Sequence, residues 1–338
     1  MGKKEQSNPP EPYSRLTVVI ILLMIAAGTI IIVLDRRQVL DLLNTSNWVF
    51  LVCALICTTA SYIAGSISFV VMMRVFGIKH RATHLFNTGL VSIVMQNLTA
   101  QPAGLSLRML LLHKHGVKNS HTVAASLLLV YFRNMLFFML VPFSLIYIVV
   151  SHHLSTFGSA TLIVMVIVVI VLLFLAGSIF FEERVRSFLL RGVGQVWRAI
   201  LRRDIHARLD QFNETLKVGA DDLRQKKENR LPLSLSLLAD VMATVLALWF
   251  CFAALGIPVH FGVMLTAFNF GVTLTLIPFI PGSMGVQEAS MAGILALFGV
   301  PFSQGVIAAI LFRVVYYFIP FVVTIPSYWG LLRAKVIK

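Results

Sequence analysis

Long, mainly apolar runs separated by short polar segments dominate this chain. Six of these runs contain 19 or more residues. At about 1.5 Å per residue, a helix of that length crosses the roughly 30 Å hydrocarbon core of a bilayer. The pattern therefore predicts six full membrane spans, at residues 16–34, 48–73, 122–150, 158–181, 231–255 and 303–332.

Two further apolar stretches, 84–112 and 261–298, are interrupted by proline and glycine. Each half has roughly 12–18 residues, which is marginal for a crossing. We therefore expect two re-entrant hairpins, although two full crossings within one stretch would give the later segments the same orientation. The predicted tips are formed by Asn97, Gln101, Pro102 and Gly104, and by Pro278, Pro281, Gly282 and Gly285.

The composition agrees with this pattern and excludes several classes of protein. Hydrophobic residues make up 58% of the chain and charged residues 12%, whereas soluble domains contain about 25% charged residues. A soluble enzyme, a secreted disulfide scaffold and a disordered chain are therefore excluded. The three cysteines lie inside apolar runs and read as small hydrophobic residues. The predicted fold class is an all-α polytopic membrane protein.

The basic residues predict an orientation. With both hairpins re-entrant, 24 of the 28 Lys and Arg residues fall on one side, and only Arg36 and Arg37 fall on the other. Because cytoplasmic loops carry the excess of Lys and Arg, we expect both termini in the cytoplasm. The membrane is expected to be the inner membrane of a prokaryote. The basic segments are residues 1–15, 74–83, 108–120, 182–230 and 333–338.

We expect residues 1–15 to be a disordered cytoplasmic tail and residues 16–338 to form a single transmembrane domain. Segment 182–230 contains 12 basic and 8 acidic residues, with apolar positions at helical spacing. It predicts an amphipathic helix on the cytoplasmic leaflet, or a docking surface for a partner protein. Interspersed acids and few aromatic residues argue against nucleic-acid binding. The sequence leaves a homodimer open.

An internal repeat is predicted between residues 48–150 and 231–332. Each contains a Pro/Gly break, a short apolar helix, a Gly-Val pair and a span with one mid-helix arginine, Arg133 or Arg313. The orientation above has the first hairpin enter from the cytoplasm and the second from outside. The repeats are then inverted, as in many secondary transporters, whose binding sites lie at the repeat interface near the midplane.

The candidate binding residues are the charges placed deep in these segments. Arg133 and Arg313 lie about eleven or twelve residues into their spans, where a charge costs at least ~2.5 kcal/mol. One interpretation is that Asp240 and Glu288 form structural ion pairs with them. The other is that the arginines bind the phosphate of an anionic lipid. Glu288 either caps the helix that follows the second tip or contacts the substrate.

Enzyme signatures are absent from the sequence. No nucleotide, dinucleotide or serine-hydrolase motif stands in a useful context, and the histidine pairs lack further metal ligands. We expect no metal and no cofactor.

Two motifs resemble those of the lysylphosphatidylglycerol synthase/flippase transmembrane region family. PFIPGSMGVQEAS is similar to the P-x-P-G-x-x-G-x-x-E-A signature, and NLTAQPAGLSLRMLLLHKHGV to a second, more degenerate one. Two positions depart from the family pattern: Gln287 stands where an arginine is usual, and Leu105 where an acid is usual. The positions that match are Asn97, Gly104, Arg108, Gly116, Arg133, Pro281, Gly282, Gly285, Glu288, Ala289 and Arg313.

The resemblance implies a lipid flippase that lacks the soluble aminoacyl-transferase domain found in some members, and hence no enzyme activity of its own. Its substrate would be an anionic or modified (aminoacyl- or glyco-) phospholipid. The alternatives are an accessory subunit or membrane enzyme of a lipid-modifying pathway, and a small-solute or ion-coupled transporter. The residues predicted to contact substrate are Arg133, Arg313, Glu288, Asp240, Arg108, Asn97 and Gln287.

Overall fold

The computed structural model describes residues 46–78, 80–98, 101–151, 227–274 and 285–333, with isolated residues between 164 and 221. The chain divides into two compact units, Met1–Ser46 and Asn47–Lys338, and all the helices named below belong to the second. Several predictions lie wholly or largely outside the described residues. These are the tail 1–15, the spans 16–34 and 158–181, segment 182–230, and Pro278, Pro281 and Gly282.

Regular structure in the described part of the chain is helical. Its helices are α3 (Trp48–Val75), α4 (Ala82–Leu98), α5 (Gln101–His113), α6 (Asn119–Ser151), α10 (Lys227–Ala254), α11 (Phe261–Leu274), α12 (Val286–Leu297), α13 (Phe302–Arg313), η2 (Val314–Phe318) and α14 (Ile319–Arg333).

Four of the predicted spans are present as helices long and apolar enough to cross a bilayer. They are α3, most of α6 and of α10, and the continuous run of α13, η2 and α14, whose apolar portions have 28, 29, 27 and 30 residues. Large apolar side chains on α3, such as Ile56 and Ile67, are exposed, as expected for a helix that faces lipid. The chain is a polytopic integral membrane protein.

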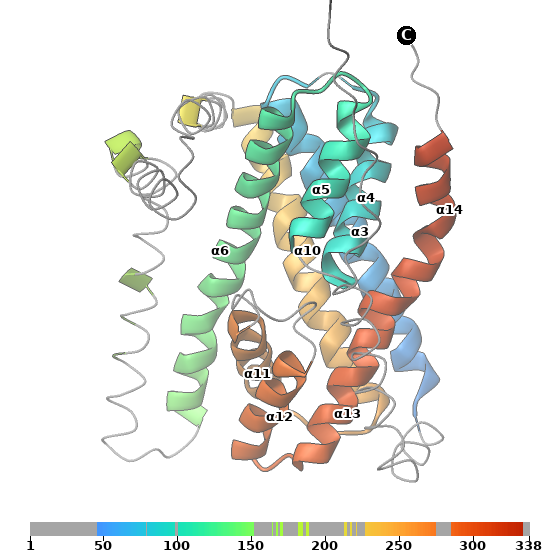
Figure 1. Cartoon of the computed structure of the whole chain (residues 1–338). Coiled ribbons are helices and arrows are strands. Elements are labelled where there is room, and N and C mark those ends of the chain that lie inside the picture. The colour runs from blue at the N-terminus through green and yellow to red at the C-terminus, as the bar shows by residue number, and fades with distance from the viewer. Residues whose placement is uncertain are drawn as a thin grey trace, which may run out of the picture. The chain divides into compact units, whose positions relative to one another are not determined.

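The same order of elements occurs in both halves of the described chain. A long helix (α3 or α10) is followed by two short helices and then by another long one (Figure 1). The short helices α4 and α5 pack against each other, as do α11 and α12. In Figure 1 the pair α4–α5 occupies the upper part of the bundle and the pair α11–α12 the lower part. The long helices α3 and α10 pack along each other and join the two halves.

The first hairpin differs from its prediction at Pro102 and Gly104. Both belong to the first turn of α5, not to a non-helical tip. Proline fits there because the first-turn amides have no partner within the helix. Gly104 serves packing: a Cβ on it would lie 2.6 Å from the Ser92 carbonyl oxygen of α4. The glycine therefore lets α4 and α5 approach closely.

The second hairpin has a turn glycine where the sequence predicts one. Gly285 precedes α12 with a φ of 82°, a left-handed conformation that glycine adopts without steric cost. No neighbouring atom would touch a Cβ at this position. Gly285 is therefore required by the backbone conformation, whereas Gly104 is required by packing.

A proline explains the irregular stretch between α13 and α14. Pro320 has no amide hydrogen, and its ring is incompatible with a normal hydrogen bond to the carbonyl four residues earlier, that of Tyr316. The helix widens to the π-helix η2 just before this proline. The hydroxyl of Tyr62 donates to the Tyr316 carbonyl at 2.8 Å, so α3 satisfies the backbone group that the proline leaves free.

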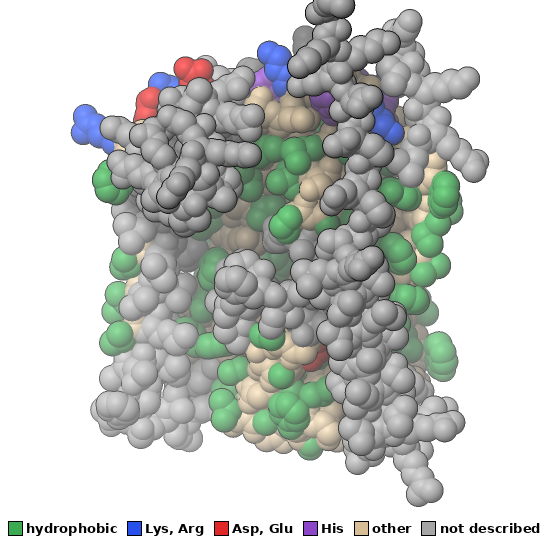
Figure 2. Space-filling model, in the orientation of Figure 1, with side chains coloured by type: hydrophobic (Ala, Val, Ile, Leu, Met, Phe, Trp, Pro, Cys, Tyr) green, Lys and Arg blue, Asp and Glu red, His purple; other side chains and the backbone are tan. Residues whose placement is uncertain are grey.

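The polar side chains on the face drawn in Figure 2 gather at one end. Most of the Lys, Arg, Asp, Glu and His side chains that can be seen lie along the upper rim, and hydrophobic side chains are spread over the flank beneath it, where a single acidic patch is also visible. Three histidines, His80, His84 and His115, lie close together, with 4.1 Å between the ring centres of His84 and His115.

Candidate functional site

A first buried ion pair joins the two halves of the chain. The Nε of Arg133, on α6, lies 2.9 Å from Oδ2 of Asp240, on α10. The Arg133 side chain is 18% exposed and that of Asp240 is 5% exposed. Both groups are thus largely removed from water in the interior of the bundle, as expected from their positions far from the ends of the predicted spans.

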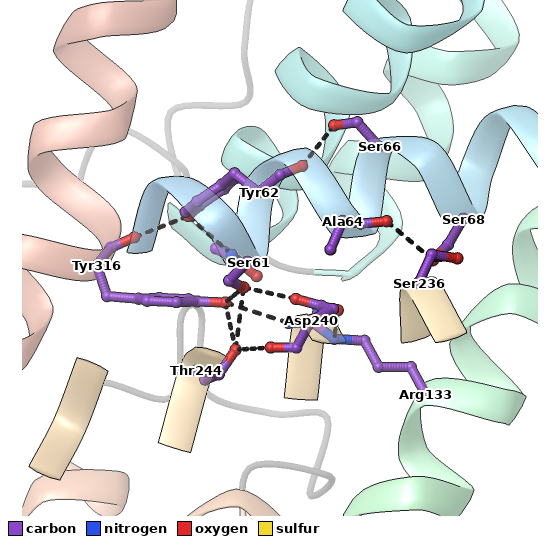
Figure 3. A network of polar contacts seen from close by, with 11 residues as sticks. Ser61, Tyr62, Ala64, Ser66, Ser68, Arg133, Ser236, Asp240, Thr244 and Tyr316 are labelled. Atoms are coloured by element: carbon purple, nitrogen blue, oxygen red, sulfur yellow. Dashed lines mark hydrogen bonds and ion pairs between the residues drawn. The ribbon is translucent and has the colours of Figure 1, made fainter. Parts of the chain in front are cut away.

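Three hydroxyl groups complete this pair (Figure 3). Ser61 on α3 donates to Asp240 Oδ1 at 2.5 Å. Because that uses its only proton, Ser61 accepts from the hydroxyl of Tyr316, 2.7 Å away. The Tyr316 oxygen in turn receives a long hydrogen bond, 3.4 Å, from Arg133 Nη2. Thr244 lies 2.8 Å from the same Tyr316 hydroxyl and donates to the Asp240 carbonyl. The result is a closed ring of donors and acceptors around one carboxylate.

The ring is connected to the C-terminal end of α4, the first helix of the first hairpin. Asn97, one residue from the end of α4, donates from Nδ2 to the Tyr62 hydroxyl at 2.9 Å. Tyr62 donates to the Tyr316 carbonyl, as described above, and its ring packs on that of Tyr316 with 5.3 Å between centres. Asn97 is therefore in contact with residues of both halves through a single tyrosine.

A second buried ion pair lies within the second half. Arg313, the last residue of α13, contacts the Glu288 carboxylate of α12 through its Nε. The other oxygen of Glu288 accepts from the Gly285 amide at 2.8 Å, so Glu288 caps α12 as one of the two interpretations expects. Arg313 Nη2 also donates to Gln287 Oε1 at 3.4 Å.

The two arginines have matching surroundings. Each contacts a carboxylate through Nε and a neutral oxygen through Nη2 at 3.4 Å. Each guanidinium also lies over an aromatic ring four residues later in its own helix. The distances to the ring centres are 5.7 Å from Arg133 to Phe137 and 5.5 Å from Arg313 to Tyr317. This equivalence extends to side chains that the sequence comparison of the repeats did not use.

Arg108 is buried, whereas its position in the sequence suggested a charged loop residue. It begins the basic segment 108–120, which the orientation prediction counts as cytoplasmic, but it is only 2% exposed. Its Nε donates to Ser92 Oγ at 2.7 Å, and its guanidinium lies 4.8 Å from the ring centre of Phe69. Arg108 is thus a buried residue of the α3–α4–α5 packing and not a loop charge.

The structure gathers most of the predicted site residues into two clusters and places one, Arg108, apart from them. One cluster is the ring around Asp240, which includes Arg133 and reaches Asn97 through Tyr62. The other is the Arg313 pair with Glu288 and Gln287. Four residues of the ring were not predicted, because hydroxyl groups on apolar helices are common and give no signal of their own. They are Ser61, Tyr62, Thr244 and Tyr316.

In the described part of the chain, no group of three or more His, Cys, Asp or Glu side chains could hold a metal ion. The arginines present hydrogen-bond donors in a low-dielectric interior, where electrostatic attraction between opposite charges is stronger than in water.

The comparisons with known proteins agree with this architecture. Residues 17–324 match the family described as Lysylphosphatidylglycerol synthase TM region. A search of curated proteins finds no match. Because the match covers most of the chain, the protein belongs to this family, and the part matched is the membrane region of these synthases.

Proposed function

We propose that this member of the family moves a phospholipid between the two leaflets of its membrane. The substrate would be an anionic or modified lipid, such as an aminoacyl- or glycophospholipid. The observation that carries the proposal is the set of arginines buried inside an apolar bundle, Arg108, Arg133 and Arg313. The family description, which names a phospholipid product, supports the same substrate class.

The cost of burying these charges supports a role beyond packing. Each charge at membrane depth costs about 2.5–3.5 kcal/mol on insertion scales. Replacing a buried ion pair by apolar residues of similar volume is often neutral or stabilising. Two pairs and a further arginine in one bundle are therefore poorly explained by stability alone. A lipid whose phosphate must pass through the hydrocarbon region needs this kind of positive, hydrogen-bonding surface.

The two hairpins provide the proposed gates. Each pair of short helices lies near one end of the bundle (Figure 1), and each hairpin contacts a buried cluster, through Asn97 in the first and Glu288 in the second. We propose that the halves form an inverted repeat with six full spans and two re-entrant hairpins. Headgroups would then reach the buried arginines from either leaflet in turn, while the acyl chains stay in the lipid.

The orientation and the partners belong to the proposal. Both termini would be cytoplasmic, because basic residues favour that side, and the membrane would be the inner membrane of a prokaryote. Segment 182–230 would lie on the cytoplasmic leaflet or bind a partner protein. Assembly of the chain into a homodimer is a further prediction that the structure does not test. Labelling of single cysteines introduced at positions 118 and 260 tests the orientation, since the former should be reached only from the cytoplasm and the latter only from outside.

A transport assay tests the function. The purified chain is reconstituted into vesicles containing fluorescent phosphatidylglycerol, and dithionite is added outside to quench the outer leaflet. The proposal predicts that the second, slower phase of quenching becomes at least tenfold faster than in protein-free vesicles. Quenching no faster than in protein-free vesicles, for phosphatidylglycerol, a lysyl-modified phosphatidylglycerol and a glycolipid alike, would contradict it.

An accessory role in lipid modification is the second candidate, favoured by the word synthase in the family description. In that case the chain would bind lipid without moving it and would recruit a modifying enzyme. This role would be supported if the chain bound lipid in detergent but moved it between leaflets no faster than protein-free vesicles do. Uptake of a water-soluble solute into the same vesicles, without lipid movement, would instead indicate a small-solute transporter.

A further inference from the structure

Among the described residues, Arg108 is a buried cation that belongs to neither buried ion pair. Its side chain is 2% exposed. Its contacts in the described part of the chain are the Ser92 hydroxyl, 2.7 Å from Nε, and the ring of Phe69. A hydroxyl and an aromatic ring hold the guanidinium in place, but neither carries a net negative charge.

The charges of the described interior do not balance. Three arginines are buried or nearly buried there, together with the two carboxylates of Asp240 and Glu288. Each carboxylate already holds another arginine, so one positive charge is left over, on Arg108. The charged side chain that acts on Arg108 electrostatically is Arg133, which has the same sign. An unpaired charge in a low-dielectric interior is strongly unfavourable, and an anion next to Arg108 would relieve it.

The size of the imbalance indicates the kind of anion. A single positive charge is balanced by a single negative one, which is the charge of a phosphodiester. A phosphomonoester carries about −1.5 to −2 at neutral pH. Because Ser92 occupies the Nε of Arg108, the two terminal nitrogens are the donors left to face a ligand. That end of a guanidinium matches two oxygens of one phosphate.

We propose that Arg108 makes the charged contact to the phosphodiester of a lipid headgroup, while the Arg133–Asp240 and Arg313–Glu288 pairs stay closed. This rests on the proposed function, from which it takes the lipid nature of the ligand. It changes the expected roles of the residues: Arg133 and Arg313 hold the helices in position, and Arg108 discriminates between headgroups.

Lipid binding to the full chain tests this assignment. The purified protein is titrated with phosphatidylglycerol, with phosphatidic acid and with diacylglycerol, and bound lipid is counted by native mass spectrometry. We expect phosphatidylglycerol to bind at least tenfold more tightly than diacylglycerol and several-fold more tightly than phosphatidic acid. Arg108→Gln should lose about tenfold for phosphatidylglycerol and nothing for diacylglycerol. Arg74→Gln, which removes an exposed arginine of α3, should match the wild type.

The source of the phosphodiester is tested by competition. Glycerophosphoglycerol carries the same headgroup without acyl chains, and it should compete weakly with phosphatidylglycerol. Competition as strong as that of the lipid itself would identify a water-soluble diester as the ligand and overturn the lipid assignment.

Several results would overturn the role of Arg108. One is an Arg108→Gln protein that melts like the wild type and keeps the full preference for phosphatidylglycerol. If this variant does not fold, the wild type decides: equal binding of phosphatidylglycerol and diacylglycerol contradicts the assignment, and the expected order supports it. Lipid transport by the wild type that Arg108→Gln leaves unchanged would contradict this inference alone, whereas no transport by the wild type would contradict the proposed function.

Discussion

The two buried ion pairs have the same local geometry but join different parts of the molecule. Arg133 and Asp240 connect α6 of the first half with α10 of the second, inside a ring of hydroxyl groups. Arg313 and Glu288 connect α13 with α12, within the second half, and Glu288 also caps its own helix. The first pair therefore fastens the halves together, and the second fastens a hairpin to the next span. The same chemistry serves the whole bundle in one place and a local contact in the other.

The largest effect is expected from breaking the pair between the halves. Asp240→Asn leaves Arg133 buried without a carboxylate, and removing one partner of a buried pair costs about 3–5 kcal/mol. The midpoint of thermal unfolding in detergent should fall sharply. Glu228→Gln, at an exposed position of α10, is the matched control and should melt like the wild type. An unchanged midpoint for Asp240→Asn would show that the pair does not hold the halves together.

Breaking the second pair should cost less and act locally. In Glu288→Gln the new amide oxygen can still accept from the Gly285 amide, and Arg313 keeps its contact with Gln287. We expect a loss on the order of 2 kcal/mol, typical of a hydrogen bond to a charged group. Hydrogen exchange should rise in α11 and α12 and stay unchanged in α3 and α6. If exchange rose equally in all four helices, the distinction between the two pairs would be wrong.

The two hairpins require a glycine for different reasons, and substitution of each glycine tests this. A Cβ on Gly104 would lie 2.6 Å from the Ser92 carbonyl oxygen and 2.7 Å from the Gln96 Cβ, so Gly104→Ala must push α4 and α5 apart, at about 1–3 kcal/mol. Gly285→Ala meets no atom within 4 Å but keeps a φ of 82°, at about 1 kcal/mol. The unfolding midpoints should rank in that order, and the reverse order would contradict the two explanations.

Removal of a single hydroxyl group should distinguish the surroundings of the two ion pairs further. Tyr316→Phe removes the oxygen that lies within hydrogen-bond distance of Ser61, Thr244 and Arg133, for a loss of about 1 kcal/mol. Tyr317→Phe keeps the ring face that Arg313 contacts and should change stability little. Equal losses from the two substitutions, measured by thermal unfolding, would argue against a special role for the ring around Asp240.

The smallest effect is a dependence on pH at the polar end of the bundle, outside the four candidate spans. Burial, and then the charges of His115 and His80, lower the pKa of the His84 imidazole from its usual 6.5. The unfolded chain therefore binds a proton at a pH where the folded chain does not, and stability falls as the pH drops below 6.5 toward the lowered value. The unfolding midpoint of His84→Gln should lose part of this dependence. A variant with the full dependence would assign it to other groups.

The sequence predicts the long helices well because their signal is local. The ranges predicted for α3, α6, α10 and α13–α14 differ by only a few residues from those in the structure, since length and apolar content decide a membrane helix. The depth of Arg133 and Arg313 identifies them as buried charges for the same reason. The partners of these arginines follow from tertiary packing, so the sequence could offer Asp240 and Glu288 but could not assign them.

Two sequence-based interpretations fail for identifiable reasons. Pro102 marks the start of α5 and not a break, because proline is as compatible with a first helical turn as with a loop. Arg108 was expected to begin a basic loop segment, whereas the helix continues to His113 and Arg108 is buried within it. The hydroxyls around Asp240 give no sequence signal, since the residues that bring them together lie up to 255 positions apart.

Transport of fluorescent phosphatidylglycerol in reconstituted vesicles tests the central claim most directly, namely that the positive charge buried between these helices carries a lipid phosphate across the membrane. The account predicts at least tenfold acceleration by the wild type over protein-free vesicles, and a return toward the protein-free rate for Arg108→Gln but not for Arg74→Gln. Wild-type vesicles that move anionic and modified lipids no faster than protein-free ones would contradict it.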